Sequence, residues 1–161
     1  MLSPPEGLII RESKPGDIGY IAYMHTKYYC TKYDFFANRE YFFMKPIADF
    51  AKDTENSKLW MAEVDGAIVG SVAILRIDET TAQFRFFLVE EQFQGMGIGS
   101  KLLNISLDYC REIGAKTVFL WTAAGLDVAR QLYEKVGFVL TDEFPSESSD
   151  GLIEQRFEMK M

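Results

Sequence analysis

The sequence is poor in the residues that bind metal ions or cross-link a chain. It contains two cysteines, Cys30 and Cys110, and one histidine, His25. Two cysteines are too few for a disulfide framework, and no histidine or cysteine neighbours either of them at the spacing of a metal site. We therefore expect no metal site, and a protein of a reducing, cytoplasmic compartment.

Long apolar runs and an excess of positive charge are missing as well. No apolar stretch approaches the length of a membrane span, and the first residues, MLSPPEG, lack the basic start and apolar core of a signal peptide. The formal net charge of -7 argues against a nucleic-acid-binding surface, because such surfaces are basic. We expect a cytoplasmic protein that contacts neither membrane nor nucleic acid. Its acidic charge is compatible with a cationic substrate.

The remaining composition is that of a globular domain. The chain has 161 residues, of which 48% are hydrophobic and 25% are charged. This length is enough for a sizeable core, and the sequence has no internal repeat, linker or low-complexity stretch. The sequence therefore predicts a single domain over residues 1–161.

Hydrophobic periodicity predicts a mixed α/β domain around one sheet. The apolar patterns predict strands at residues 7–11, 59–64, 67–77, 82–89, 117–122, 138–142 and 153–161. Helical spacing predicts helices at residues 18–29, 39–52, 98–113 and 127–136, the second of them kinked or divided by Pro46. Asp65-Gly66 supplies a β-hairpin turn. The alternation of the strand at 82–89 breaks at Phe87-Leu88-Val89, which indicates either a β-bulge or passage into full burial.

Three glycines stand before the helix at 98–113, in the turn Gln94-Gly95-Met96-Gly97-Ile98-Gly99. Glycine lets the backbone approach a ligand closely, and the N-terminus of a helix favours phosphate. The alternative is a plain strand-to-helix turn. Two phosphate motifs are excluded by spacing. Gly99-Ser100-Lys101 has the wrong order for a P-loop, and Ser100 stands where a dinucleotide fingerprint needs its third glycine.

This turn and a second element resemble the GNAT superfamily of N-acetyltransferases. The turn supplies Q-x-x-G-x-G, with Gln94, Gly97 and Gly99, and residues 129–138, ARQLYEKVGF, supply A-x-x-L-Y-x-x-x-G-F. The order of elements agrees over residues 7–161. The resemblance is closest to GNAT domains that often follow a MarR-type winged-helix domain, for which this chain has no room.

The resemblance implies a fold and an activity. The fold is a mostly antiparallel sheet of about seven strands with a bulge in the fourth, flanked by about four helices. Acetyl-CoA is the implied donor, and the acceptor is the primary amine of a small molecule or a protein, attacking directly in a ternary complex. Dimers are common in the family, so a homodimer is compatible with the resemblance. The sequence leaves two other classes open, a non-catalytic acetyl-CoA sensor and a structural domain with a degenerate pocket.

The resemblance also implies positions for the donor and for the catalytic acid. The backbone of Phe87, Leu88 and Val89 would pair with the pantetheine arm, and an N–H near Leu88 would stabilise the oxyanion. Tyr133 matches the family tyrosine that protonates the departing thiolate; the alternative is a core aromatic. The pyrophosphate would lie on the amides of Gly95, Met96, Gly97, Ile98, Gly99 and Ser100.

The general base is not evident from the sequence. Many relatives place a glutamate at positions that align with Gln83 and Trp121, and neither of these residues can take a proton. Leu126 stands where many relatives have an asparagine. A water chain, an acceptor amine of low pKa or Glu63 remain as substitutes, and we favour the water.

Arg85 and a group of helical aromatic residues have two interpretations each. Arg85 lies within a strand, where a charge is costly unless it is paired. We favour an ion pair with Glu63 over the alternative, a clamp for a substrate carboxylate. By resemblance, an acceptor site would be lined by the first helices and by Trp121; for each helical residue simple packing is favoured. The helical residues are His25, Tyr28, Tyr29 and Tyr33.

Overall fold

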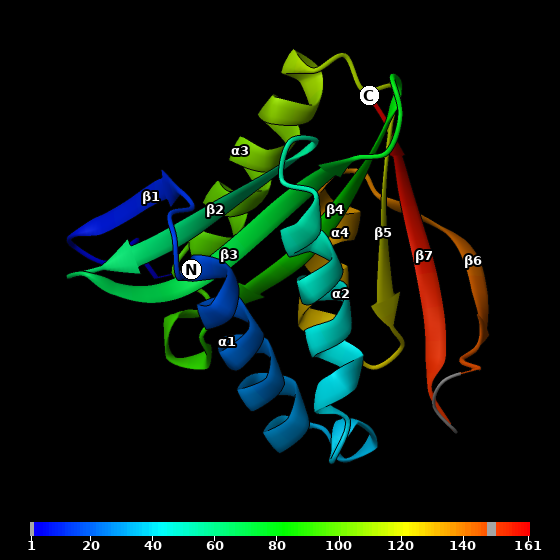
Figure 1. Ribbon diagram of the computed structural model, residues 1–161, viewed down its shortest axis with the longest axis horizontal. Helices are drawn as coiled ribbons and strands as arrows, with labels where there is room; N and C mark the ends of the chain where they lie inside the picture. The colour runs from blue at the N-terminus through cyan, green and yellow to red at the C-terminus, as the bar shows by residue number, and fades with distance from the viewer. Residues whose placement is uncertain (1, 148–150) are drawn as a thin grey trace.

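A computed structural model describes residues 2–147 and 151–161, and in these ranges it contains one seven-stranded sheet and four α-helices (Figure 1). The strand order is β1-β2-β3-β4-β5-β7-β6, and every neighbouring pair is antiparallel except β4 with β5. The expected mixed α/β fold is confirmed. The elements are β1 (Leu8–Glu12), α1 (Asp17–Lys32), η1 (Asp34–Phe36), α2 (Glu40–Lys52), β2 (Ser57–Val64), β3 (Ala67–Arg76), β4 (Thr81–Val89), η2 (Glu91–Phe93), α3 (Ile98–Glu112), β5 (Thr117–Ala123), α4 (Asp127–Val136), β6 (Val139–Pro145) and β7 (Ile153–Lys160).

The predicted hairpin turn joins β2 to β3. Asp65 and Gly66 both have positive φ, 50° and 81°, as a two-residue hairpin turn with right-handed strand twist requires. Pro46 does not divide its helix, since α2 runs continuously from Glu40 to Lys52. Helix α1 extends to Lys32, three residues beyond the predicted end at residue 29. Such boundary differences are common, because helix ends carry weak sequence signals.

A β-bulge interrupts β4, as the break in alternation indicated. Ser71 of β3 pairs with Leu88 and Ala73 pairs with Arg85, so two residues of β4 lie opposite the single residue between them. Phe86 is one of the two, and its φ of 51° is unusual for a bulky side chain. The Ser71 hydroxyl donates a hydrogen bond to the Phe86 carbonyl oxygen at 2.7 Å. This bond stabilises the strained backbone and bends β4 at this point.

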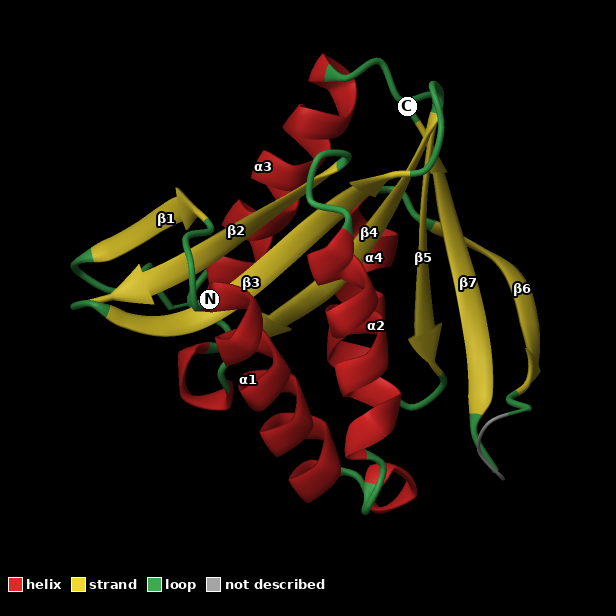
Figure 2. Cartoon of the chain, viewed as in Figure 1, coloured by secondary structure: helices red, strands yellow, loops and turns green. Residues whose placement is uncertain are grey.

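Strands β4 and β5 are paired only where they begin. The ladder joins residues 81–83 of β4 to residues 117–119 of β5. Beyond it the two strands diverge, so the later part of β4 has no strand partner on its β5 side (Figure 2). The two strands are the fourth and fifth in the strand order, so they diverge in the middle of the sheet.

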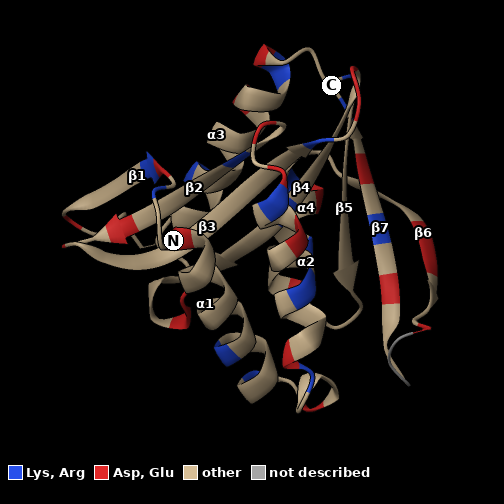
Figure 3. Cartoon of the chain, viewed as in Figure 1, with Lys and Arg blue, Asp and Glu red and all other residues tan. Residues whose placement is uncertain are grey.

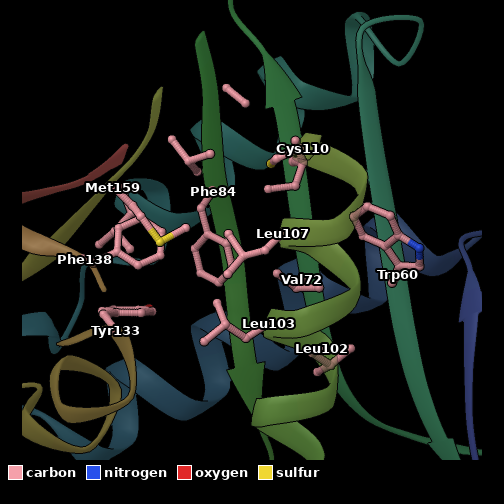
Figure 4. Close-up of a cluster of buried hydrophobic side chains, with 14 of the residues drawn as sticks. Trp60, Val72, Phe84, Leu102, Leu103, Leu107, Cys110, Tyr133, Phe138 and Met159 are labelled. Atoms are coloured by element: carbon pink, nitrogen blue, oxygen red, sulfur yellow. The ribbon is translucent and has the colours of Figure 1, made fainter. Parts of the chain in front are cut away.

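Helices cover both faces of the sheet. Helices α3 and α4 cover one face, where Phe84 lies between the leucines of α3 and Tyr133 of α4 (Figure 4). Helices α1 and α2 cover the other face, with Ile21 and Phe50 packed against the sheet. Each buried apolar side chain of this size contributes about 1.5–3 kcal/mol, so both layers hold the split sheet together.

Candidate active site

A cavity of about 680 Å³ lies where β4 and β5 diverge, on the side of α1 and α2. Residues 83–87 of β4 and residues 120–123 of β5 form its base. Residues from α1, α2 and the segment between them cover it, and Tyr133 of α4 reaches it through the opening in the sheet. Its size is that of a small-molecule site.

A narrower groove of about 130 Å³ adjoins the cavity. Its wall includes Phe87, Leu88 and Val89 at the end of β4, together with residues of α4. Tyr29, Phe87 and Leu126 line both spaces, so the groove and the cavity meet at the diverging strands. A long ligand in the groove would therefore present its end to the cavity.

The glycine turn lies at the outer end of this groove. Gly95 and Gly97 have φ of 76° and 81°, values that are costly for any residue with a side chain. The first helical hydrogen bond of α3 runs from the Lys101 amide to the Gly97 oxygen. Within the described chain, the amides of residues 95–100 have no protein acceptor. These N–H groups, with the positive end of a 15-residue helix behind them, are free to donate to an anionic group such as a phosphate.

Gln94 and Gly99 fix this turn in place. The side-chain Nε2 of Gln94 donates to the Val89 carbonyl oxygen at 2.9 Å and to the Tyr28 hydroxyl at 3.3 Å. A Cβ at Gly99 would come within 3.3 Å of both Leu132 and Phe87. Gln94 therefore ties the turn to β4 and α1, and Gly99 allows α3 to approach α4.

Tyr133 is enclosed by aromatic rings but lines the cavity. Its ring lies 5.7 Å from that of Phe84 and 6.0 Å from that of Phe138, both edge-on, and the residue is 6% exposed. Burial, with a smaller contribution from Tyr29, raises the pKa of its phenol well above the usual value, so the group keeps its proton at neutral pH. No hydrogen-bond partner for this hydroxyl is found in residues 2–147 and 151–161. It is a proton donor without a protein acceptor.

His25 lines the cavity from α1, and its side chain is largely buried. Its Nδ1 lies 2.7 Å from the Ile21 carbonyl oxygen, which can only accept, so Nδ1 carries the proton. The shielded Nε2 is then a lone-pair acceptor, and no partner for it is found in the part of the chain that the structure describes. Burial lowers the pKa of His25 to about 4, so the imidazole is neutral at pH 7.

Glu63 does not pair with Arg85, and that expectation was wrong. Glu63 binds Arg11 at 2.7 Å, and Arg11 in turn binds Asp17 at 2.6 Å. The strand order explains the error, because β3 lies between the strands of Glu63 and Arg85. Glu63 also does not line the cavity, which removes it as a substitute for the general base.

The remaining residues singled out in the sequence are divided between the two spaces. Gln83, Arg85 and Trp121 line the cavity. Tyr28 and Tyr33 line the narrower groove instead. The aromatic cluster is also packing, since the Tyr29 ring stacks on that of Phe43 at 5.0 Å.

Glu154 is a cavity residue that the sequence did not reveal. It lies on β7 opposite Ala123 of β5 and is the one carboxylate among the described residues that line the cavity. The Ser146 hydroxyl donates to it at 2.6 Å. No local pattern could have identified Glu154, because only the strand order brings β7 beside β5.

Two further features are absent from the described residues. No helix among them is long and apolar enough to span a membrane. No group of three or more His, Cys, Asp or Glu side chains among them is arranged to hold a metal ion.

Comparison with known proteins relates this geometry to a family. The model of the family described as "Acetyltransferase (GNAT) family" matches residues 21–138. The "Probable N-acetyltransferase camello" of Xenopus tropicalis is 35% identical over 104 residues, which are 60% of this chain and 47% of that protein. The chain thus spans about half the length of the curated relatives it matches.

Solved structures share the fold over nearly the whole chain. An acetyltransferase from Streptococcus agalactiae superposes with a TM-score of 0.78 at 20% identity, covering 98% of this chain and 100% of that one. A GNAT family acetyltransferase from Elizabethkingia anophelis with acetyl-CoA bound gives a TM-score of 0.68 at 18% identity, with coverage of 98% and 100%. The fold of the chain is therefore shared with these acetyltransferases.

Proposed function

Because the chain belongs to the GNAT family of acetyltransferases, we propose that it transfers the acetyl group of acetyl-CoA to a primary amine by direct attack in a ternary complex. The observation that carries the proposal is the meeting of groove and cavity at Phe87, beside Tyr133. A thioester at the end of the groove would there meet an amine that enters from the cavity. Such positioning replaces a covalent enzyme intermediate.

The donor would occupy the narrow groove. Its pyrophosphate would lie on the unpaired amides of Gly95 through Ser100, and its pantetheine arm along Phe87, Leu88 and Val89. The divergence of β5 leaves this edge of β4 free to bond an extended ligand in place of a strand. The relative from Elizabethkingia anophelis, crystallised with acetyl-CoA, supports this assignment.

Tyr133 would act as the general acid. The neutral amine attacks the thioester carbonyl, the tetrahedral intermediate collapses, and the carbon–sulfur bond breaks. The phenol then donates its proton to the departing thiolate, and it regains a proton as the products leave. Its burial keeps the phenol protonated at neutral pH, which is the state that a general acid requires.

Glu154 would receive the proton that the amine loses. Neither Gln83 nor Trp121 can accept a proton, and the His25 Nε2 is shielded from the cavity. Glu154 borders the same space, and an ordered water would carry the proton to it. This route keeps the water relay that we favoured from the sequence, and Glu154 is the group that finally accepts the proton.

Thiol release tests the function against a second candidate, a non-catalytic acetyl-CoA sensor, which the missing carboxylates at Gln83 and Trp121 favour. Acetyl-CoA at 100 times its Kd should first stabilise the fold by about 2.7 kcal/mol. We then expect free CoA to accumulate with some members of a panel of amines, amino acids and peptides. Stabilisation without release from any acceptor would identify a sensor, and no stabilisation would exclude both.

A further inference from the structure

Among the described residues, Arg85 is a cation in the cavity wall that has no hydrogen-bond or ion-pair partner. It lies half-buried on β4, with its guanidinium carbon 4.9 Å from the centre of the Phe86 ring. Among the residues that the structure describes it makes no ion pair within 4.0 Å and no side-chain hydrogen bond. Its five N–H donors are therefore unused by the protein.

The nearest acidic group is already engaged. Asp49 is the one carboxylate among the described residues whose charge raises the pKa of Arg85. That carboxylate binds Lys45 at 2.6 Å and lies 3.8 Å from Lys52. Desolvation outweighs it and lowers the pKa of Arg85, which shows that the charge is only weakly compensated. A partly desolvated cation of this kind is costly unless a ligand pairs with it.

The charge of the cavity wall is opposite to that of the chain. Acidic side chains are dispersed over the helices and over β6 and β7, and the formal net charge is -7 (Figure 3). The described residues of the wall nevertheless include Arg39, Lys45 and Arg85, with Glu154 as the one acid. In an apolar enclosure the Arg85 guanidinium attracts an anionic group more strongly than it would in water. Lys45 contributes less, because Asp49 binds it at 2.6 Å.

The wall is also rich in aromatic side chains. Phe42, Phe43, Phe86 and Trp121 line the cavity together with Arg85. We propose, on the basis of the acetyltransferase function above, that Arg85 binds the carboxylate of the acceptor, an amine with an apolar or aromatic body such as an aromatic amino acid. A guanidinium fits a carboxylate through two parallel N–H bonds, which would also orient the amine.

The test compares two acceptors that differ only in the carboxylate, phenylalanine and phenethylamine. The quantity compared is kcat/KM for phenylalanine divided by kcat/KM for phenethylamine. Arg85→Gln should lower this ratio by about 10- to 100-fold, the range for a lost charge-assisted hydrogen bond. Arg85→Lys keeps the charge but cannot donate two parallel N–H bonds. Its ratio should lie between those of the wild type and Arg85→Gln. Arg111→Gln, which removes the same charge from an exposed site on α3, should leave the ratio as it is. An equal loss for both acceptors, or transfer to phenethylamine alone, would overturn the assignment.

A binding measurement separates this inference from the proposed function. 3-Phenylpropionate carries the carboxylate and the ring but no amine, so its binding requires no chemistry. Calorimetry should find about 10-fold or greater weakening in Arg85→Gln, with Arg111→Gln unchanged. Binding that is absent in the wild type, or equal in folded Arg85→Gln, would refute the carboxylate site. Failure of thiol release with every amine would refute the acetyltransferase proposal alone.

Discussion

The Ser71 hydroxyl bonds the carbonyl oxygen of Phe86, the residue of β4 whose φ is 51°. This contact joins the fully buried part of β3 to the bulge that separates β4 from β5. The Ser71 hydrogen bond therefore supports the bulge from the β3 side, next to the point where β4 and β5 diverge. The first prediction concerns this contact.

Ser71→Ala should lower the free energy of unfolding by about 1–3 kcal/mol, because it leaves the Phe86 oxygen without its partner. Urea unfolding monitored by circular dichroism measures the change. Ser57→Ala is the matched control, since the Ser57 hydroxyl bonds the Asp53 oxygen at an exposed site, and it should cost less than about 0.5 kcal/mol. Equal effects of the two substitutions would show that the bulge does not depend on Ser71.

Tyr133→Phe should lower kcat by roughly 10²-fold and leave acetyl-CoA binding nearly intact. Stability should change little, because no described protein group bonds the hydroxyl. Steady-state kinetics and calorimetric titration give the two quantities. Tyr109→Phe on α3, whose ring packs on Trp60, controls for loss of a phenol elsewhere. An unaltered kcat under conditions where chemistry limits the rate would remove Tyr133 as the acid.

Gly99→Ala should weaken acetyl-CoA binding, because its methyl group would come within 3.3 Å of Leu132 and Phe87 and move α3 away from the groove. Gly19→Ala provides the opposite case. Gly19 lies in α1 with open space around it, so alanine there should stabilise the protein by about 0.5–1 kcal/mol without changing the Kd. Thermal unfolding and titration distinguish the two. If both variants bind acetyl-CoA as the wild type does, the close approach at Gly99 has no role in binding.

Glu154→Gln should lower kcat/KM by roughly 10²-fold, because a glutamine amide cannot take the proton that the amine loses. Steady-state kinetics with a fixed acceptor amine measure the change. A kcat/KM equal to that of the wild type would remove Glu154 as the proton acceptor.

His25 should make stability depend on pH between about 4 and 6.5. Its pKa is lowered to about 4 in the folded protein by burial, whereas an unfolded histidine titrates near 6.5. In this window the unfolded chain binds a proton that the folded one does not, so stability falls as the pH falls. The loss is about 3 kcal/mol, on the basis of 1.36 kcal/mol for each pKa unit. Urea unfolding of His25→Gln should lack this component, and parallel pH dependence of wild type and variant would contradict it.

Local patterns in the sequence predicted the helices and strands and the glycine turn. Asp65-Gly66, the glycines from Gly95 to Gly99 and the apolar periodicity of α3 each act through neighbouring residues, so one strand and one helix suffice to reveal them. The break at Phe87 predicted the bulge for the same reason. Local physical chemistry determines these features.

The acceptor side depends on which strands become neighbours. Arg85 lost its expected partner because β3 separates it from Glu63, and Glu154 joined the cavity because β7 inserts beside β5. These are pairings between distant parts of the chain, and the apolar pattern of each strand is the same for either order. The glycine turn could therefore be predicted from the sequence, whereas the charged residues that line the cavity could not.

The short ladder between β4 and β5 has a mechanical consequence. Only residues 81–83 and 117–119 are paired across it. The sheet therefore consists of two parts, β1-β2-β3-β4 and β5-β7-β6, joined by this short ladder, which would serve as a hinge between them. Relative rotation of the two parts breaks few backbone hydrogen bonds. A molecule lying along the free edge of β4 bridges the two parts, and slower amide hydrogen exchange beside the hinge would record that bracing.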